Sequence, residues 1–107
     1  MNEQKLRGLL GLAIRARKAS AGIDACRMMI RSGKCGVMML DDATGINTRK
    51  KAEELCRKTG TPLIILKAGT IEEAIGKSNM VISVQSGSFA EQFLKANEIQ
   101  TIRQSVK

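Results

Sequence analysis

The chain contains no histidine, no tryptophan, no tyrosine and only two phenylalanines among its 107 residues. Without histidine, the pairing of a nucleophile with an imidazole base is excluded, and a metal site lacks its commonest ligand. With so few aromatic rings, recognition of bases by stacking on Tyr, Trp or Phe is not expected. No apolar run approaches the roughly 20 residues that a membrane-spanning helix needs.

Cysteine is also scarce, and the positions of the three cysteines do not fit the spacing of a metal site. Cys26, Cys35 and Cys56 lie far apart and form no CxxC pair. Their number is odd, each lies on or beside an apolar stripe, and the start of the chain is polar rather than signal-like. We therefore expect reduced, buried thiols in a cytoplasmic protein, with neither a metal site nor a cofactor.

Positive charge is what the chain has in excess. Its 18 basic residues outnumber 10 acidic ones, which gives a formal net charge of +8. In so small a domain, this excess is typical of proteins with phosphate-rich partners. A solvated basic surface without a partner is the alternative.

Helical and strand patterns alternate along the sequence. The expected helices cover residues 3–17, 22–33, 48–59, 70–76 and a last segment from residue 88, and the expected strands cover 18–21, 37–40, 63–66 and 80–84. This alternation predicts an α/β fold with helices on both faces of a small sheet. We expect one domain over residues 1–107, in which residues 98–107 form a frayed tail.

Polar side chains are expected where several of these helices begin. Asn47 or Thr48 should cap the third helix, and the Ser/Thr-x-x-Glu patterns that begin at Thr70 and Ser88 read as capping boxes. Gly33 should close the second helix in a left-handed conformation.

Catalysis is not expected from the polar residues. Asp41 and Asp42 follow a buried strand, but adjacent side chains point apart on an extended chain. A role in loop hydrogen bonds or capping is therefore favoured over an acid–base or metal pair. The chain also contains no GxxxxGK[ST] and no GxGxxG phosphate-binding motif.

Three segments favour RNA binding instead. A helix start at residues 22–25 would present backbone N–H groups to phosphate. Arg49, Lys50 and Lys51 are expected in the first turn of the third helix, where the helix dipole disfavours cations. A polar turn, residues 77–79, precedes the last strand. Recognition should therefore depend on the shape and backbone of the RNA and on polar contacts to base edges.

Five runs carry a family resemblance: residues 9–18, 20–22, 30–34, 40–43 and 47–51. They resemble the kink-turn-binding ribosomal protein superfamily of the L-seven-Ae/L-thirty-e type, and within it the bacterial YlxQ-like branch, through about residue 95. The resemblance implies a three-layer α-β-α sandwich with a four-stranded mixed sheet. It also implies binding to the sheared G·A pairs of a kink-turn in RNA.

The RNA-reading helix of this superfamily carries a Gly-x-Asn-Glu-x-x-Lys pattern, which falls here on residues 22–28. The glycine is kept, whereas Asp24, Ala25 and Met28 replace the asparagine, the glutamate and the lysine. Asp24 has no amide donor, Ala25 has no polar group, and Met28 has no charge. Each lost bidentate base contact costs roughly 1–3 kcal/mol of discrimination.

The sequence thus predicts a non-catalytic protein that binds structured RNA, with kink-turn and ribosomal RNA as candidates, in association with the ribosome or translation. The alternative is a protein-interaction module of the same fold that docks on a translation or ribosome-assembly factor. Neither a small-molecule substrate nor a membrane partner is expected. The candidate RNA-binding residues are Gly22, Asp24, Ala25, Arg27, Met28, Arg31, Asp42, Asn47, Arg49, Lys50, Lys51, Lys77, Ser78 and Asn79.

Overall fold

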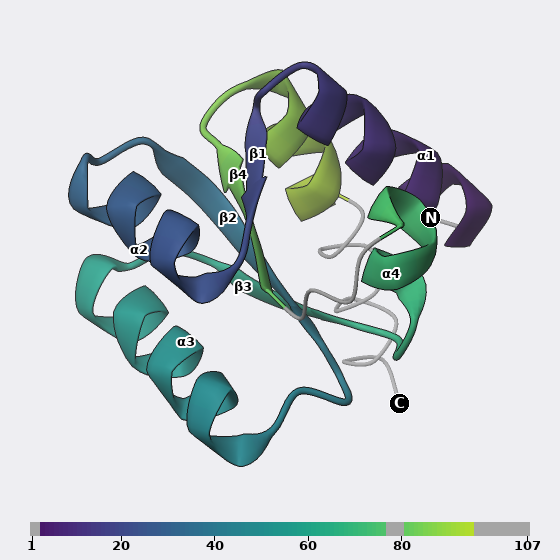
Figure 1. The fold of residues 1–107 in the computed structure, drawn as a ribbon. Coiled ribbons are helices and arrows are strands. Elements are labelled where there is room, and N and C mark those ends of the chain that lie inside the picture. Colours follow the sequence, from purple (N-terminus) through teal and green to yellow (C-terminus); the bar gives the residue numbers. More distant parts are fainter. Residues whose placement is uncertain (1–2, 77–80, 96–107) are drawn as a thin grey trace, which may run out of the picture.

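Figure 1 shows a computed structural model of the chain, which describes residues 3–76 and 81–95. The helices are α1 (Glu3–Arg15), α2 (Ile23–Arg31), α3 (Ile46–Thr59), α4 (Thr70–Ile75) and a helix over residues 88–95, and the strands are β1 (Ala19–Ala21), β2 (Cys35–Asp41), β3 (Leu63–Leu66) and β4 (Val81–Gln85). The expected turn at residues 77–79 and the expected tail at 98–107 lie outside the described residues. No helix within the described ranges is long and apolar enough to cross a membrane.

The four strands form one mixed sheet in the order β1-β4-β2-β3. Strand β4 is antiparallel to both β1 and β2, whereas β2 and β3 are parallel. Strands β1, β2 and β3 therefore run in the same direction, and the helices that follow them, α2, α3 and α4, all begin at one edge of the sheet (Figure 1). We call this edge, where Gly22, Gly45 and Gly69 precede the three helices, the helix-start edge.

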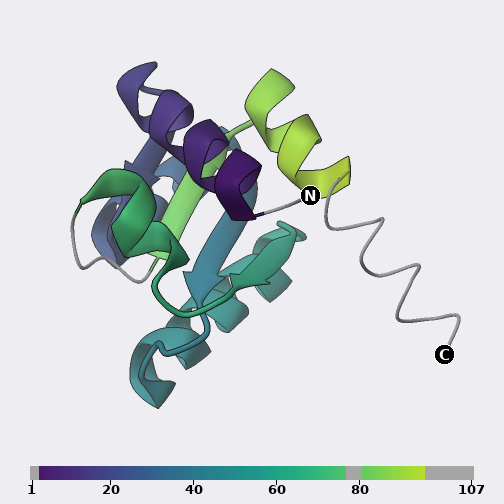
Figure 2. The same ribbon diagram turned by 90° about the vertical axis from the view of Figure 1, so that its right-hand side faces the viewer.

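Helices cover both faces of the sheet, as predicted. Helices α2 and α3 pack on one face, and α1, α4 and the helix over residues 88–95 pack on the other (Figures 1 and 2). Strand β2 shows why its apolar run is continuous: Val37 and Met39 face the second group of helices, whereas Met38 and Leu40 face α2 and α3. All four side chains are fully buried. The architecture is the three-layer α-β-α sandwich that the resemblance implied.

Glycines, and not polar side chains, precede α2, α3, α4 and the last helix. Gly45 is the N-cap of α3, because its carbonyl accepts the first helical hydrogen bond, from the N–H of Arg49 at 3.0 Å. Gly69 precedes α4, and Gly87 precedes the last helix, where φ angles of 89° and 138° disfavour other residues. The expectation that Asn47 or Thr48 caps α3 is therefore wrong, and so are both predicted capping boxes.

This earlier start changes the position of the basic run in α3. Because α3 begins at Ile46, residues 49–51 lie in its second turn and not in its first. The unfavourable effect of the dipole on cations falls off within the first turn. The helix dipole therefore disfavours these three cations less than the sequence indicated, and their positions in α3 do not by themselves require an anionic partner.

The C-terminal end of α1 differs from the prediction, whereas that of α2 agrees with it. Helix α1 ends at Arg15, two residues earlier than predicted, because Arg17 takes a left-handed conformation with φ 59°. The N–H of Lys18 then donates to the carbonyl of Ala13 at 2.8 Å and closes the helix end. Gly33 does the same for α2 with φ 73°, as predicted.

Candidate nucleic-acid interface

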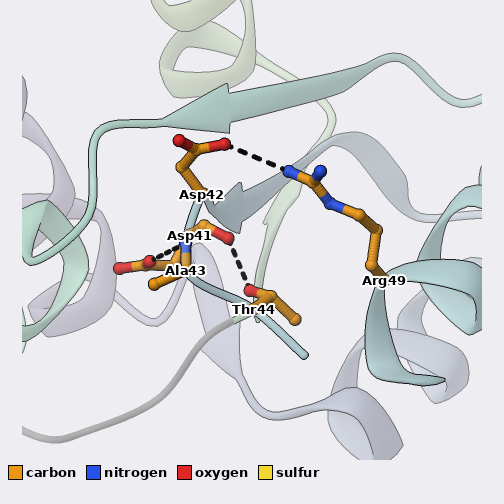
Figure 3. A network of polar contacts seen from close by, with 5 residues as sticks. All are labelled: Asp41, Asp42, Ala43, Thr44 and Arg49. Atoms are coloured by element: carbon orange, nitrogen blue, oxygen red, sulfur yellow. Dashed lines mark hydrogen bonds and ion pairs between the residues drawn. The ribbon is translucent and has the colours of Figure 1, made fainter. Parts of the chain in front are cut away.

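Asp41 organises the loop between β2 and α3. Its buried carboxylate accepts hydrogen bonds from the N–H of Ala43 at 2.7 Å and from the N–H of Gly69 at 3.0 Å. Its carbonyl accepts a third, from the hydroxyl of Thr44 at 2.6 Å (Figure 3). Asp41 therefore joins the loop before α3 to the loop before α4. This is the loop-bonding role that the sequence favoured over an acid–base or metal pair.

Asp42 points away from Asp41 and contacts α3. Its Oδ1 lies 3.3 Å from Nη2 of Arg49 (Figure 3). The Arg49 side chain is 31% exposed, and its Nε is buried without an acceptor among the described residues. A guanidinium has five N–H donors, so this contact orients Arg49 and leaves donors for another ligand.

The three adjacent cations of α3 face different surroundings, because successive side chains on a helix are 100° apart. Arg49 turns toward Asp42. Lys50 lines an open groove of about 780 Å³ between α3 and the start of β3, together with Leu63. Lys51 instead lines a groove between α3 and α2, together with Arg27. The structure thus separates the two lysines and brings Lys51 beside α2.

Gly22 precedes helix α2 as its N-cap, with a positive φ of 97° that favours glycine, and no side chain caps the helix. The N–H of Gly22 donates to the carbonyl of Val81 at 2.9 Å, which attaches the helix start to β4. The side chain of Asp24 is 92% exposed, and its carboxylate lies 3.7 Å from the guanidinium of Arg27. The first turn of α2 thus keeps its backbone N–H groups free of side-chain caps, as the RNA hypothesis requires.

Two candidate residues of α2 lie on a different side of the helix. Ala25 and Met28 line a pocket of about 350 Å³ beside β1, together with Ser20 and Lys34. The Met28 side chain is exposed to 72%. Neither residue lines the groove that holds Arg27 and Lys51, so the structure does not bring them together with those two cations.

The remaining candidates differ in how well the structure describes them. Arg31 is exposed in the last turn of α2, and Asn47 is exposed in the first turn of α3. Lys77, Ser78 and Asn79 lie outside the described residues.

Lys58 is a functional candidate that the sequence did not indicate. It forms an ion pair with Glu54 at 3.2 Å, and it also lines the groove between α2 and α3. The available signal was its spacing, because Lys58 follows Lys51 by seven residues and so returns to the same face of the helix.

The thiols offer no reactive group. Cys26, Cys35 and Cys56 are free, and Cys26 and Cys56 are buried as predicted, whereas Cys35 is only half-buried. Burial raises the pKa of Cys26 and of Cys56 from 9.0 to about 11, and it also raises the pKa of Cys35. Thiols with raised pKa values are not thiolates at neutral pH and are poor nucleophiles. Within residues 3–76 and 81–95, no group of three or more Cys, Asp or Glu residues is placed to hold a metal ion.

The chain is similar in sequence to two proteins of known name. The chain is 31% identical over 88 residues to the RNA-binding protein YlxQ of Bacillus subtilis, which covers 80% of this chain and 88% of that protein. It is 29% identical over 91 residues to the RNA-binding protein YlxQ of Enterococcus faecium, which covers 84% of this chain and 88% of that protein. No family profile matches the chain.

Solved structures share the fold. A protein of unknown function from Bacillus halodurans superposes with a TM-score of 0.77 at 28% identity, over 83% of this chain and 92% of that one. The 15.5kD RNA binding protein of Giardia lamblia superposes with a TM-score of 0.74 at 12% identity, over 90% of this chain and 87% of that one. At that identity the second likeness concerns the fold alone.

Proposed function

The chain belongs to the family of the RNA-binding protein YlxQ, and we propose on that basis that it binds structured RNA in the cytoplasm and catalyses no reaction. The observation that carries the proposal is the helix-start edge. There the uncapped starts of α2 and α3 lie beside Arg27, Arg49 and Lys51 on a chain of net charge +8. Backbone N–H groups and cations together bind phosphate.

We propose further that the RNA is a folded RNA of the translation machinery and that a kink-turn is among its features. The contacts to such an RNA should be mostly to its backbone, because Asp24 can only accept hydrogen bonds and Met28 presents an exposed apolar side chain. Phosphate contacts position a protein on RNA, whereas base contacts specify sequence. We therefore place Arg27, Arg31, Arg49 and Lys51 in the proposed site and leave Lys50, which lies on the β3 side of α3, outside it.

The first test is a titration with a kink-turn RNA and with the same duplex lacking the G·A pairs, at two salt concentrations. We expect both RNAs to bind with steep salt dependence, with at most about tenfold preference for the kinked RNA, because base-reading groups are replaced. Failure of the protein to bind either RNA would contradict the proposed function.

A matched pair of variants then tests the surface. Arg31→Gln with Arg49→Gln removes two cations from the α2–α3 layer, and Arg15→Gln with Lys95→Gln removes the same charge from the other layer. The first pair should weaken RNA binding and reduce its salt slope by about 2, and the second should leave the slope nearly unchanged. Equal losses would mean that only net charge matters.

A second candidate function, docking on a translation or ribosome-assembly factor, is favoured by Met28 alone. This large side chain is exposed to 72% beside the pocket next to β1, and the flexible thioether of methionine suits an adaptable contact with a protein partner. Met28→Lys should then abolish the co-purification of a protein partner whose association resists nuclease treatment. RNA binding by this variant should be kept or strengthened. Retention of the protein partner by this variant would exclude docking through Met28.

A further inference from the structure

Helices α2 and α3 lie side by side on one face of the sheet (Figure 1). Side chains from both helices line a groove between them. Its lining residues, which define what we call the α2–α3 groove, are Arg27, Lys51, Glu54, Leu55 and Lys58, and its volume is about 140 Å³. Three of the five side chains are cationic and one is anionic. The groove therefore has an excess of positive charge over a half-buried apolar residue.

The anionic groups nearby neutralise only part of this charge. Glu54 pairs with Lys58 at 3.2 Å, and Asp24 reaches Arg27 only at 3.7 Å. Lys51 forms no ion pair with any described residue. Lys51 thus places an uncompensated cation in the same groove as the guanidinium of Arg27. The two positive charges repel each other, and an anion bound between them would relieve this repulsion.

The direction of the groove relates it to the helix-start edge. Arg27 and Lys51 lie in the second turns of their helices, near that edge, and Lys58 lies in the last turn of α3. Seven residues of helix separate the two lysines by about 10 Å. The cations thus form a track that leads away from the helix-start edge, along α3, rather than a single anion pocket.

We propose that the α2–α3 groove binds the phosphodiester backbone of the RNA after it leaves the helix-start edge. This inference rests on the proposed function and adds to it a second contact, which includes Lys58 and excludes the cations on the β3 side of α3. Binding there would be through phosphates, without base recognition, since lysine side chains act as point charges.

The chain contains a matched control for this proposal. Lys50 and Arg57 each precede a groove lysine by one residue, carry the same charge and line the other groove, beside β3. Lys51→Gln with Lys58→Gln and Lys50→Gln with Arg57→Gln therefore make the same change in net charge on different sides of one helix. The groove lysines and their counterparts are all exposed, so both pairs should leave the fold intact, which circular dichroism and urea unfolding would check.

The experiment measures the affinity of both variant pairs for a kink-turn RNA as a function of salt, by fluorescence anisotropy. Each phosphate contact contributes roughly 0.7–0.9 to the slope of log affinity against log salt. Loss of both groove lysines should lower this slope by about 1.5 and reduce affinity on the order of 30-fold at about 0.1 M salt. The control pair should change the slope by less than about 0.5.

The outcomes distinguish failure of the α2–α3 groove as an RNA contact from failure of the proposed RNA-binding function. Equal effects of the two pairs, or a larger effect of the control pair, would overturn the groove as a contact while RNA binding itself stands. Absence of RNA binding by the unmodified protein would overturn both. A selective loss in the Lys51 and Lys58 variant would support the groove.

Discussion

Helices α3 and α4 both begin at the helix-start edge after a glycine, yet their first residues differ in charge. Helix α4 has Glu72 and Glu73 in its first turn, which suit the positive end of the helix dipole. Helix α3 has no acidic residue in its first turn, and three cations follow at once in its second. The sequence of α4 thus favours stability of the helix, whereas that of α3 gives up this contribution on the layer where we propose that RNA binds.

The two helical layers also differ in how closely they pack on the sheet. On the face covered by α1, α4 and the last helix, β2 approaches the last helix so closely that a Cβ atom on Gly36 would lie 2.8 Å from Ala90 Cβ and from Ser86 Cα. The opposite core, under α2 and α3, is built largely of sulfur-containing and small side chains: Cys26, Met38, Ala52 and Cys56. One layer is therefore constrained sterically, while the other carries the cations of the proposed RNA site.

The largest expected effect tests the close packing. Gly36→Ala should destabilise the protein by about 2–3 kcal/mol, because both contacted groups belong to the backbone or to a buried alanine and have little room to shift. Gly8→Ala is the matched control: its Cβ would meet nothing within 4 Å in α1, so it should stabilise by about 0.5–1 kcal/mol. Urea unfolding measures both. Similar stabilities of the two variants would contradict the difference in packing.

An intermediate effect tests how the loops of the two layers are joined. Asp41→Asn should lower the free energy of unfolding by about 2 kcal/mol. The two carboxylate oxygens of Asp41 accept hydrogen bonds from the N–H groups of Ala43 and Gly69, whereas an amide is uncharged and has only one acceptor oxygen. Asp42→Asn, one residue later, should cost less than about 1 kcal/mol, because its contact with Arg49 is exposed. Equal costs in thermal unfolding would show that Asp41 is not the joining residue.

The smallest effect tests the contrast between the two helix starts. Gly45 has φ −60° and ψ 153°, suited to a capping side chain, and a Cβ there meets nothing within 4 Å. Gly45→Ser and Gly45→Asp should therefore both stabilise by roughly 0.3–1 kcal/mol. Only the aspartate should weaken RNA binding, because its charge repels phosphate. If serine and aspartate bind RNA alike, phosphate does not approach the start of α3.

Much of the fold followed from local patterns. The continuous apolar run at residues 37–40 identified a strand buried on both faces, and Gly33 identified a helix end. Helix starts were predicted less well: Thr70 has the residue type of an N-cap but lies buried in the first turn of α4. The backbone conformation that enters a helix depends on where the preceding strand ends, which propensity does not encode.

The candidate site was predicted in its elements but not in its arrangement. Arg27 and Lys51 were named, yet nothing in their spacing of 24 positions indicated that they line one groove. Lys50 was named with Lys51, although the two lie on different sides of α3. Lys58 was not among the candidate residues, although it lines the same groove.

Periodicity and composition were enough to establish the α/β sandwich, the buried thiols and the cationic character of the chain, because each depends on residues close in sequence or on their total number. The positions of the cations relative to one another required the packed structure. They depend on the rotation of α3 about its axis and on its contact with α2, and both are set by the apolar residues, such as Ala52 and Cys56, that α3 buries on the sheet.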